Sequence, residues 1–64
     1  MDFNKVKGLF DSLQNRVNDT QTDVTKFTDG NSSAGTRVRR AMQAIKSLAQ
    51  ELRIEIQAQK NSEF

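Results

Sequence analysis

Residues 3–28 read FNKVKGLFDSLQNRVNDTQTDVTKFT. Apolar side chains recur here in alternating steps of three and four positions, the spacing that places them on one stripe of an α-helix. Of the eight positions on this stripe, seven are apolar and one, Thr20, is polar. The pattern predicts one long helix over about residues 3–28, with Asp2 as its N-terminal cap. The stripe consists of Phe3, Val6, Phe10, Leu13, Val17, Thr20, Val24 and Phe27.

A turn at about residues 29–32 interrupts this pattern. Gly30 can adopt the left-handed backbone conformation that ends many helices, and Asn31 or either serine after it can cap the next helix. A second helix is predicted over about residues 33–60. Its apolar stripe is broader than that of the first helix, as is typical of a helix in a bundle. The stripe comprises Ala34, Val38, Ala41, Met42, Ile45, Leu48, Ala49, Leu52 and Ile56.

Two helices of similar length joined by a short turn fold back on each other as an antiparallel hairpin. We therefore expect an all-α chain with a single helical-hairpin domain over residues 1–64. Pairing about the turn sets Val24 opposite Val38 and Phe10 opposite Leu52. A lone hairpin leaves much of both stripes in water, and so short a chain cannot offset its conformational entropy without further burial. We expect a homodimer or higher homo-oligomer in which the hairpins form a four-helix bundle, with a partner of different sequence as the alternative.

The composition excludes several classes of function. The sequence contains no Cys and no His, so it has no disulfide, no soft metal ligand and no imidazole for acid–base catalysis near neutral pH. A chain of this length also buries too little surface to hold a deep cleft. No enzymatic activity, cofactor, metal or small-molecule substrate is therefore expected. The first ten residues mix charged and apolar side chains, so we expect no signal peptide, no membrane association and a cytoplasmic location.

Positive charge is concentrated in the middle of the chain. The overall net charge is +2, but residues 26–46 hold five basic residues and one acidic residue, a net charge of +4 against −2 for the remainder. The start of the second helix carries three arginines and no acid, although a helix N-terminus favours negative charge. An external phosphate would supply that charge, and Arg is suited to bind it bidentately. The predicted phosphate-binding residues are Arg37, Arg39, Arg40 and Lys26, with the hydroxyls of Ser32, Ser33 and Thr36, and with Gly35 leaving the backbone open to a phosphate.

These arginines have a second interpretation. Basic clusters on helices also keep bundles soluble or pair with carboxylates across an interface. The alternative function is therefore a structural or protein-interaction bundle whose arginines contact an acidic protein partner. Stacking on nucleic-acid bases is not expected, because the four phenylalanines lie on the apolar stripe or in the tail.

A spaced motif runs through the same segment, with Gly30-Asn31, Ala34-Gly35, Arg37 and Arg39-Arg40. It resembles the small bacterial histone-like nucleoid proteins of the chlamydial type, which carry approximately Gly-Asn-Lys-x-Ala-Gly-x-Arg-x-Arg-Lys before a long amphipathic helix. The resemblance covers about half of the chain and implies DNA binding and nucleoid organisation. Ser32 stands where the family has lysine, and the family's lysine- and alanine-rich tail is missing. We therefore expect modest, salt-sensitive and largely sequence-nonspecific contact with the phosphate backbone of DNA, without strong compaction.

Overall fold

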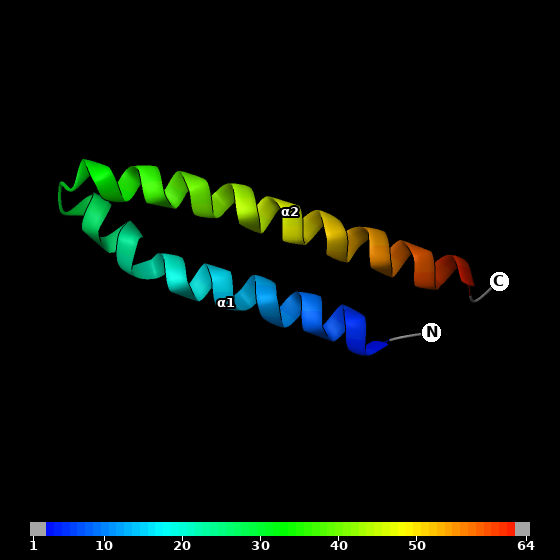
Figure 1. Ribbon diagram of the computed structural model, residues 1–64. Coiled ribbons are helices and arrows are strands. Elements are labelled where there is room, and N and C mark those ends of the chain that lie inside the picture. Colours follow the sequence, from blue (N-terminus) through cyan, green and yellow to red (C-terminus); the bar gives the residue numbers. More distant parts are fainter. Residues whose placement is uncertain (1–2, 63–64) are drawn as a thin grey trace.

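The computed structural model describes residues 3–62 and contains two helices that lie side by side (Figure 1). Helix α1 spans Phe3–Thr28 and helix α2 spans Ser32–Ser62. The chain reverses direction between them, which confirms the predicted all-α antiparallel hairpin. Helix α2 begins one residue earlier and ends two residues later than expected. Asp2, the predicted cap of the first helix, and the tail residue Phe64 lie outside the described residues.

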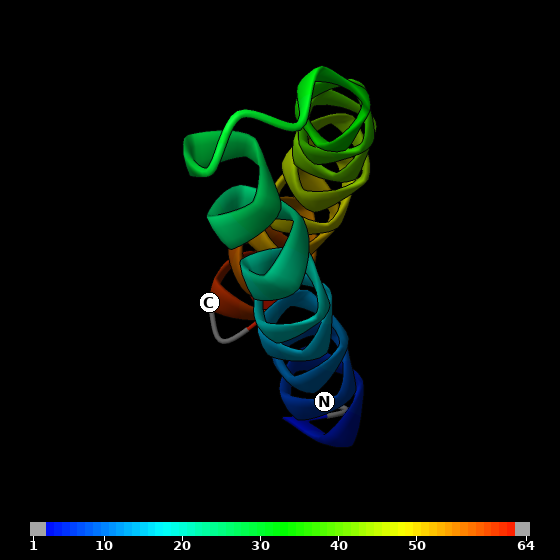
Figure 2. The ribbon, with the colours of Figure 1, turned by 90° about the vertical axis from the view of Figure 1, so that its left-hand side faces the viewer.

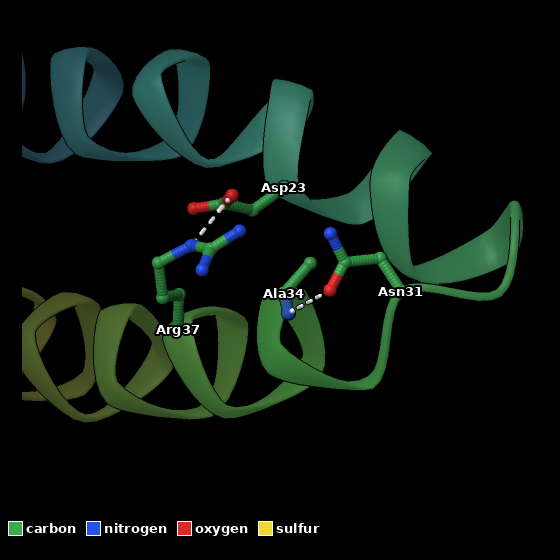
Figure 3. A network of polar contacts seen from close by, with 4 residues as sticks. All are labelled: Asp23, Asn31, Ala34 and Arg37. Carbon is green, nitrogen blue, oxygen red and sulfur yellow. Dashed lines mark hydrogen bonds and ion pairs between the residues drawn. The ribbon is translucent and has the colours of Figure 1, made fainter.

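Gly30 sets the turn between the helices, as its position in the sequence predicts. Its φ angle is +105°, in the left-handed region that glycine adopts without strain. Its amide donates a hydrogen bond of 3.0 Å to the carbonyl of Phe27, and the amide of Asn31 donates one of 3.0 Å to the carbonyl of Lys26. These two bonds form a Schellman motif, which closes the end of α1. Asn31 then caps α2, because its Oδ1 accepts a hydrogen bond of 3.2 Å from the amide of Ala34 (Figure 3).

The sides of the helices that face each other are only partly buried. Ala34 is the one fully buried apolar side chain in the described part of the chain. Thr20, the polar position on the α1 stripe, is also buried, and its hydroxyl donates a hydrogen bond of 2.7 Å to the carbonyl of Arg16. The polar exception on the stripe therefore leaves no buried hydrogen-bonding group unsatisfied. The half-buried apolar residues are Val6, Leu9, Leu13, Val38, Ala41, Ala44, Ile45, Leu48, Ala49 and Leu52.

The structure divides the apolar stripe of α1 into two rows. Val6, Leu13 and Thr20 face α2 and are half-buried or buried. The other row is exposed, although the sequence places Val24 opposite Val38 and Phe10 opposite Leu52 in the hairpin. A pair of helices has no third element to cover that side, as the view along the rod shows (Figure 2). The exposed row consists of Phe3, Phe10, Val17 and Val24.

Within residues 3–62, two ion pairs join the helices, one near each end of the hairpin. Near the turn, Nε of Arg37 lies 2.9 Å from Oδ1 of Asp23 (Figure 3). Near the open end, Nζ of Lys5 lies 3.2 Å from Oε2 of Glu55. Successive residues of a helix are rotated by about 100°, which puts both pairs on the same side of the hairpin. Both basic side chains are exposed and both carboxylates are half-buried. Pairs so near the surface add little free energy, so their main effect is to align the helices.

The hairpin is a rod with extents of 52 × 15 × 11 Å. Its radius of gyration is 15.2 Å, whereas a compact chain of this length would have about 11 Å. Its accessible surface is 5082 Å², against about 4,100 Å² for a compact folded protein of this mass. Within residues 3–62, neither helix contains a stretch apolar enough to cross a membrane.

Candidate nucleic-acid interface

The three arginines of α2 near the turn point in different directions. Because each residue is rotated by about 100° from the last, Arg37 points toward α1 while Arg39 and Arg40 point away from it. Arg39 and Arg40 line a shallow hollow of ≈ 270 Å³ with Thr36 and Gln43, on the side of α2 that faces away from α1. Both arginines are exposed, and neither has a carboxylate partner among the residues that the structure describes. Their positive charge is therefore available to an external anion.

Arg37 differs from its two neighbours, and here the expectation from sequence needs correction. No acid stands in the first turn of α2, so the sequence predicts three unpaired arginines. The hairpin supplies an acid from the other helix, since Oδ1 of Asp23 lies 2.9 Å from Nε of Arg37 (Figure 3). Arg37 is therefore a link between the helices, with only part of its guanidinium group open to a phosphate.

The first turn of α2 presents backbone amides beside exposed hydroxyls. The first amides of any helix lack a partner within the helix, and they form the positive end of its dipole. Asn31 occupies the amide of Ala34, which leaves the amides of Ser32 and Ser33 pointing out of the helix end. Both serine side chains are exposed. Together they provide hydrogen-bond donors for an anion at the end of the rod.

Gly35 has a different role from the one that the sequence predicts. A β-carbon at this position would lie 2.8 Å from both Cδ2 and Cε2 of the Phe27 ring. The ring covers the backbone that a phosphate was expected to reach, so Gly35 serves the packing of α1 against α2. Phe27 lies on the α1 stripe as predicted, but it remains 54% exposed. It borders a second hollow of ≈ 330 Å³ whose other lining residues are Ser32, Gly35, Thr36, Val38 and Arg39.

Lys26 lies in the last turn of α1 and is exposed. It lines a separate hollow on α1 together with Asn18, Gln21, Thr22 and Thr25. The structure thus brings Thr36, Arg39 and Arg40 together in one hollow and does not place Lys26 beside them. Lys26 adds positive charge to the same end of the rod from the other helix.

A second basic feature runs along the whole of α2, and the charge count over residues 26–46 misses it. Arg39, Lys46, Arg53 and Lys60 are each seven residues apart, so they form a line with steps of about 10.5 Å along the helix. All four are exposed, and none belongs to an ion pair within the described range. We call these four residues the basic row. Their seven-residue spacing is visible in the sequence and could have revealed the row.

Comparison with known proteins agrees with the spaced motif around the turn. The sequence model of the family described as Histone H1-like protein Hc1 matches residues 7–62, which include the turn and nearly all of both helices. Comparisons with curated proteins and with solved structures find no match. The resemblance to a chlamydial histone-like protein is thereby confirmed over almost the whole chain.

Proposed function

Because the chain belongs to the Histone H1-like protein Hc1 family, we propose that it is a non-enzymatic nucleoid protein that grips DNA phosphates with the turn end of its hairpin. A histone-like family indicates a structural, DNA-binding role and, for this chain, a place in the cytoplasmic nucleoid. The observation that carries the proposal is the pair Arg39 and Arg40. They are exposed, unpaired within residues 3–62, and grouped around Thr36 near the positive end of α2.

The proposed contacts use two kinds of donor. Arg39 and Arg40 reach phosphate oxygens with their guanidinium groups, which form strong, charge-assisted hydrogen bonds. The amides and hydroxyls of Ser32 and Ser33 bind a further phosphate at the start of the helix. Arg37 and Lys26 add charge nearby. Phosphates carry no sequence information, so binding is largely independent of DNA sequence.

Fluorescence anisotropy with a labelled DNA duplex of arbitrary sequence tests this function. At about 50 mM salt we expect clear binding by the natural protein, and a loss of about 10- to 100-fold for Arg39→Gln/Arg40→Gln, because two phosphate contacts are removed. The charge-matched control is Lys7→Gln/Arg16→Gln, which changes two exposed basic residues of α1 away from the turn. The control should lose much less affinity. No binding by the natural protein, or an equal loss in both variants, would rule the proposal out.

The alternative is a structural bundle whose arginines meet an acidic protein. The material that co-purifies with the chain separates the two functions. The sequence contains no Trp and no Tyr, so the protein itself absorbs very little near 280 nm. A nucleic-acid absorbance spectrum in the purified fraction supports DNA binding, whereas a stoichiometric second protein band supports the alternative.

The proposed active form is a homodimer or higher homo-oligomer whose hairpins pack as a four-helix bundle. Support comes from the exposed row of α1 and from the large accessible surface of the rod. The apolar stripes of both helices extend over most of the hairpin, so a second hairpin can cover them along their full length.

A further inference from the structure

One side of the hairpin is apolar along its whole length. The exposed row of α1 runs in steps of seven residues from Phe3, which is 64% exposed, to Val24, which is 43% exposed. A matching row on α2 contains Met42 and Ile56, which are 44% and 41% exposed, with Ala49 between them. With about 100° per residue and antiparallel helices, both rows turn to the same side, opposite the two ion pairs. We call this side the apolar face; its residues are Phe3, Phe10, Val17, Val24, Gly35, Met42, Ala49 and Ile56.

The surface area of the hairpin fits one partner of its own size. The rod exposes 5082 Å², which exceeds the surface of a compact protein of this mass by about 1,000 Å². A standard protein interface buries about 800 Å² on each partner. Ala34 is the single buried apolar residue of the described chain, so the hairpin has almost no core of its own. A second copy, whose apolar face has the same length, supplies the missing core.

The charges at the borders of the apolar face decide how two copies are oriented. The α2 border is the basic row, whereas the α1 border holds Lys7, Gln14, Gln21 and Thr28. Two faces can stack with two-fold symmetry in two ways. With the turns at opposite ends, α2 lies against α2 of the second copy, and the two basic rows repel each other. With the turns at the same end, each basic row lies beside the nearly neutral α1 border.

We propose that two copies associate through their apolar faces with both turns at the same end. The turn ends of the two hairpins then form one continuous basic surface. The meaning of that surface as a DNA contact rests on the proposed function; the association itself does not. Arg39 and Arg40 of both copies then contact one DNA duplex at the same end of a four-helix rod. The basic rows run along the two outer edges of this rod.

Spin-label distances test the orientation without DNA. The sequence has no cysteine, so Asp29→Cys places a single nitroxide at the turn, and Asn15→Cys places one near mid-length. Double electron–electron resonance should give a turn-to-turn distance of about 20–30 Å for faces that pack like neighbouring helices. Turns at opposite ends would be separated by roughly the rod length of 52 Å. A long turn distance with a short mid-length distance overturns the orientation, and no dipolar signal from either label overturns the association.

A matched pair of substitutions tests the face. Val17 and Ile54 are both exposed, at 49% and 58%, but Ile54 lies on the side away from the apolar face. In sedimentation equilibrium, Val17→Lys should raise the dimer dissociation constant by at least about 100-fold, because it buries an unpaired charge. Ile54→Lys should change it by no more than about 3-fold, as an exposed substitution does. Equal effects of the two substitutions on the dissociation constant, or no effect of either, would contradict the proposal that the apolar face is the interface. Circular dichroism checks that both variants stay helical. DNA anisotropy of the natural protein is measured separately, so a failure of DNA binding is distinguishable from a failure of this association.

Discussion

Gly8 and Gly35 both lie inside helices but have opposite surroundings. Apart from its chain neighbours and the backbone of its own helix, nothing lies within 4 Å of where a β-carbon on Gly8 would stand. At Gly35, the same atom would lie 2.8 Å from the ring of Phe27. Both glycines are equally evident in the sequence, but the sequence does not indicate which of them the packing of the two helices requires. The difference arises only when α1 and α2 are aligned, so residue-level roles that depend on the other helix could not be predicted.

These two glycines should respond in opposite directions to alanine. Gly8→Ala should raise the free energy of unfolding by about 0.5–1 kcal/mol, because glycine weakens an open helix interior. Gly35→Ala should lower it by about 1 kcal/mol, since the overlap with Phe27 exceeds the gain in helix propensity. Chemical denaturation followed by circular dichroism measures both. The loss at Gly35 should disappear in a Phe27→Ala background; a loss that persists there would contradict the ring contact.

Glu55 should make the hairpin sensitive to acid. The hydrogen bond from Gln59, followed by the contact with Lys5, holds the pKa of the Glu55 carboxyl below its ordinary value of 4.5. The stabilisation that the ionised Glu55 carboxylate contributes is therefore complete above the ordinary pKa, which applies to the unfolded chain. It is lost as the pH falls through the lowered pKa of the folded state. Glu55→Gln should lower the melting temperature at pH 7 and cause little change at pH 3. Glu51→Gln, at an exposed position of the same helix, is the control. A difference between natural protein and Glu55→Gln that does not shrink in acid would refute this interpretation.

At the scale of elements, local patterns predict each helix well. Steps of three and four residues predict α1 over the range that the structure gives it, and Gly30 with Asn31 marks the turn. The same patterns cannot tell which half of a broad stripe faces the other helix. They also miss the Asp23–Arg37 pair, which joins residues from two helices. Of the candidate site, the sequence identifies Arg39 and Arg40 but cannot separate them from Arg37.

The basic row gives a graded prediction for DNA binding. If DNA contacts Arg39 and Arg40, Lys46 lies about 9 Å along α2 from Arg40, and Lys60 lies about 21 Å farther. Lys46→Gln should therefore weaken binding by about 2- to 5-fold at low salt, and Lys60→Gln should have almost no effect, because screening limits charges beyond about 10 Å. Anisotropy titrations of the two single variants give the comparison. Equal losses would mean that DNA lies along the rod and not at its end.

At the scale of the whole molecule, the two proposed tasks fall on different parts of the hairpin. The apolar face is the proposed interface, whereas the turn end holds the exposed Arg39 and Arg40, so each can be altered without the other. The sequence predicts the need for a partner from chain length and the width of the stripes. It could not suggest the proposed orientation of two copies, which depends on how the basic row and the apolar rows lie around the two aligned helices.

The most direct test of the account is the salt dependence of DNA affinity, measured per dimer by anisotropy between about 50 and 200 mM salt. With about three phosphate contacts at each of two tips, the slope of log K against log salt concentration should be about −5. Arg39→Gln/Arg40→Gln should reduce the slope to about −2, since two contacts are lost at each tip. A slope that is the same for both proteins would contradict the claim that the two turn ends bind DNA through Arg39 and Arg40.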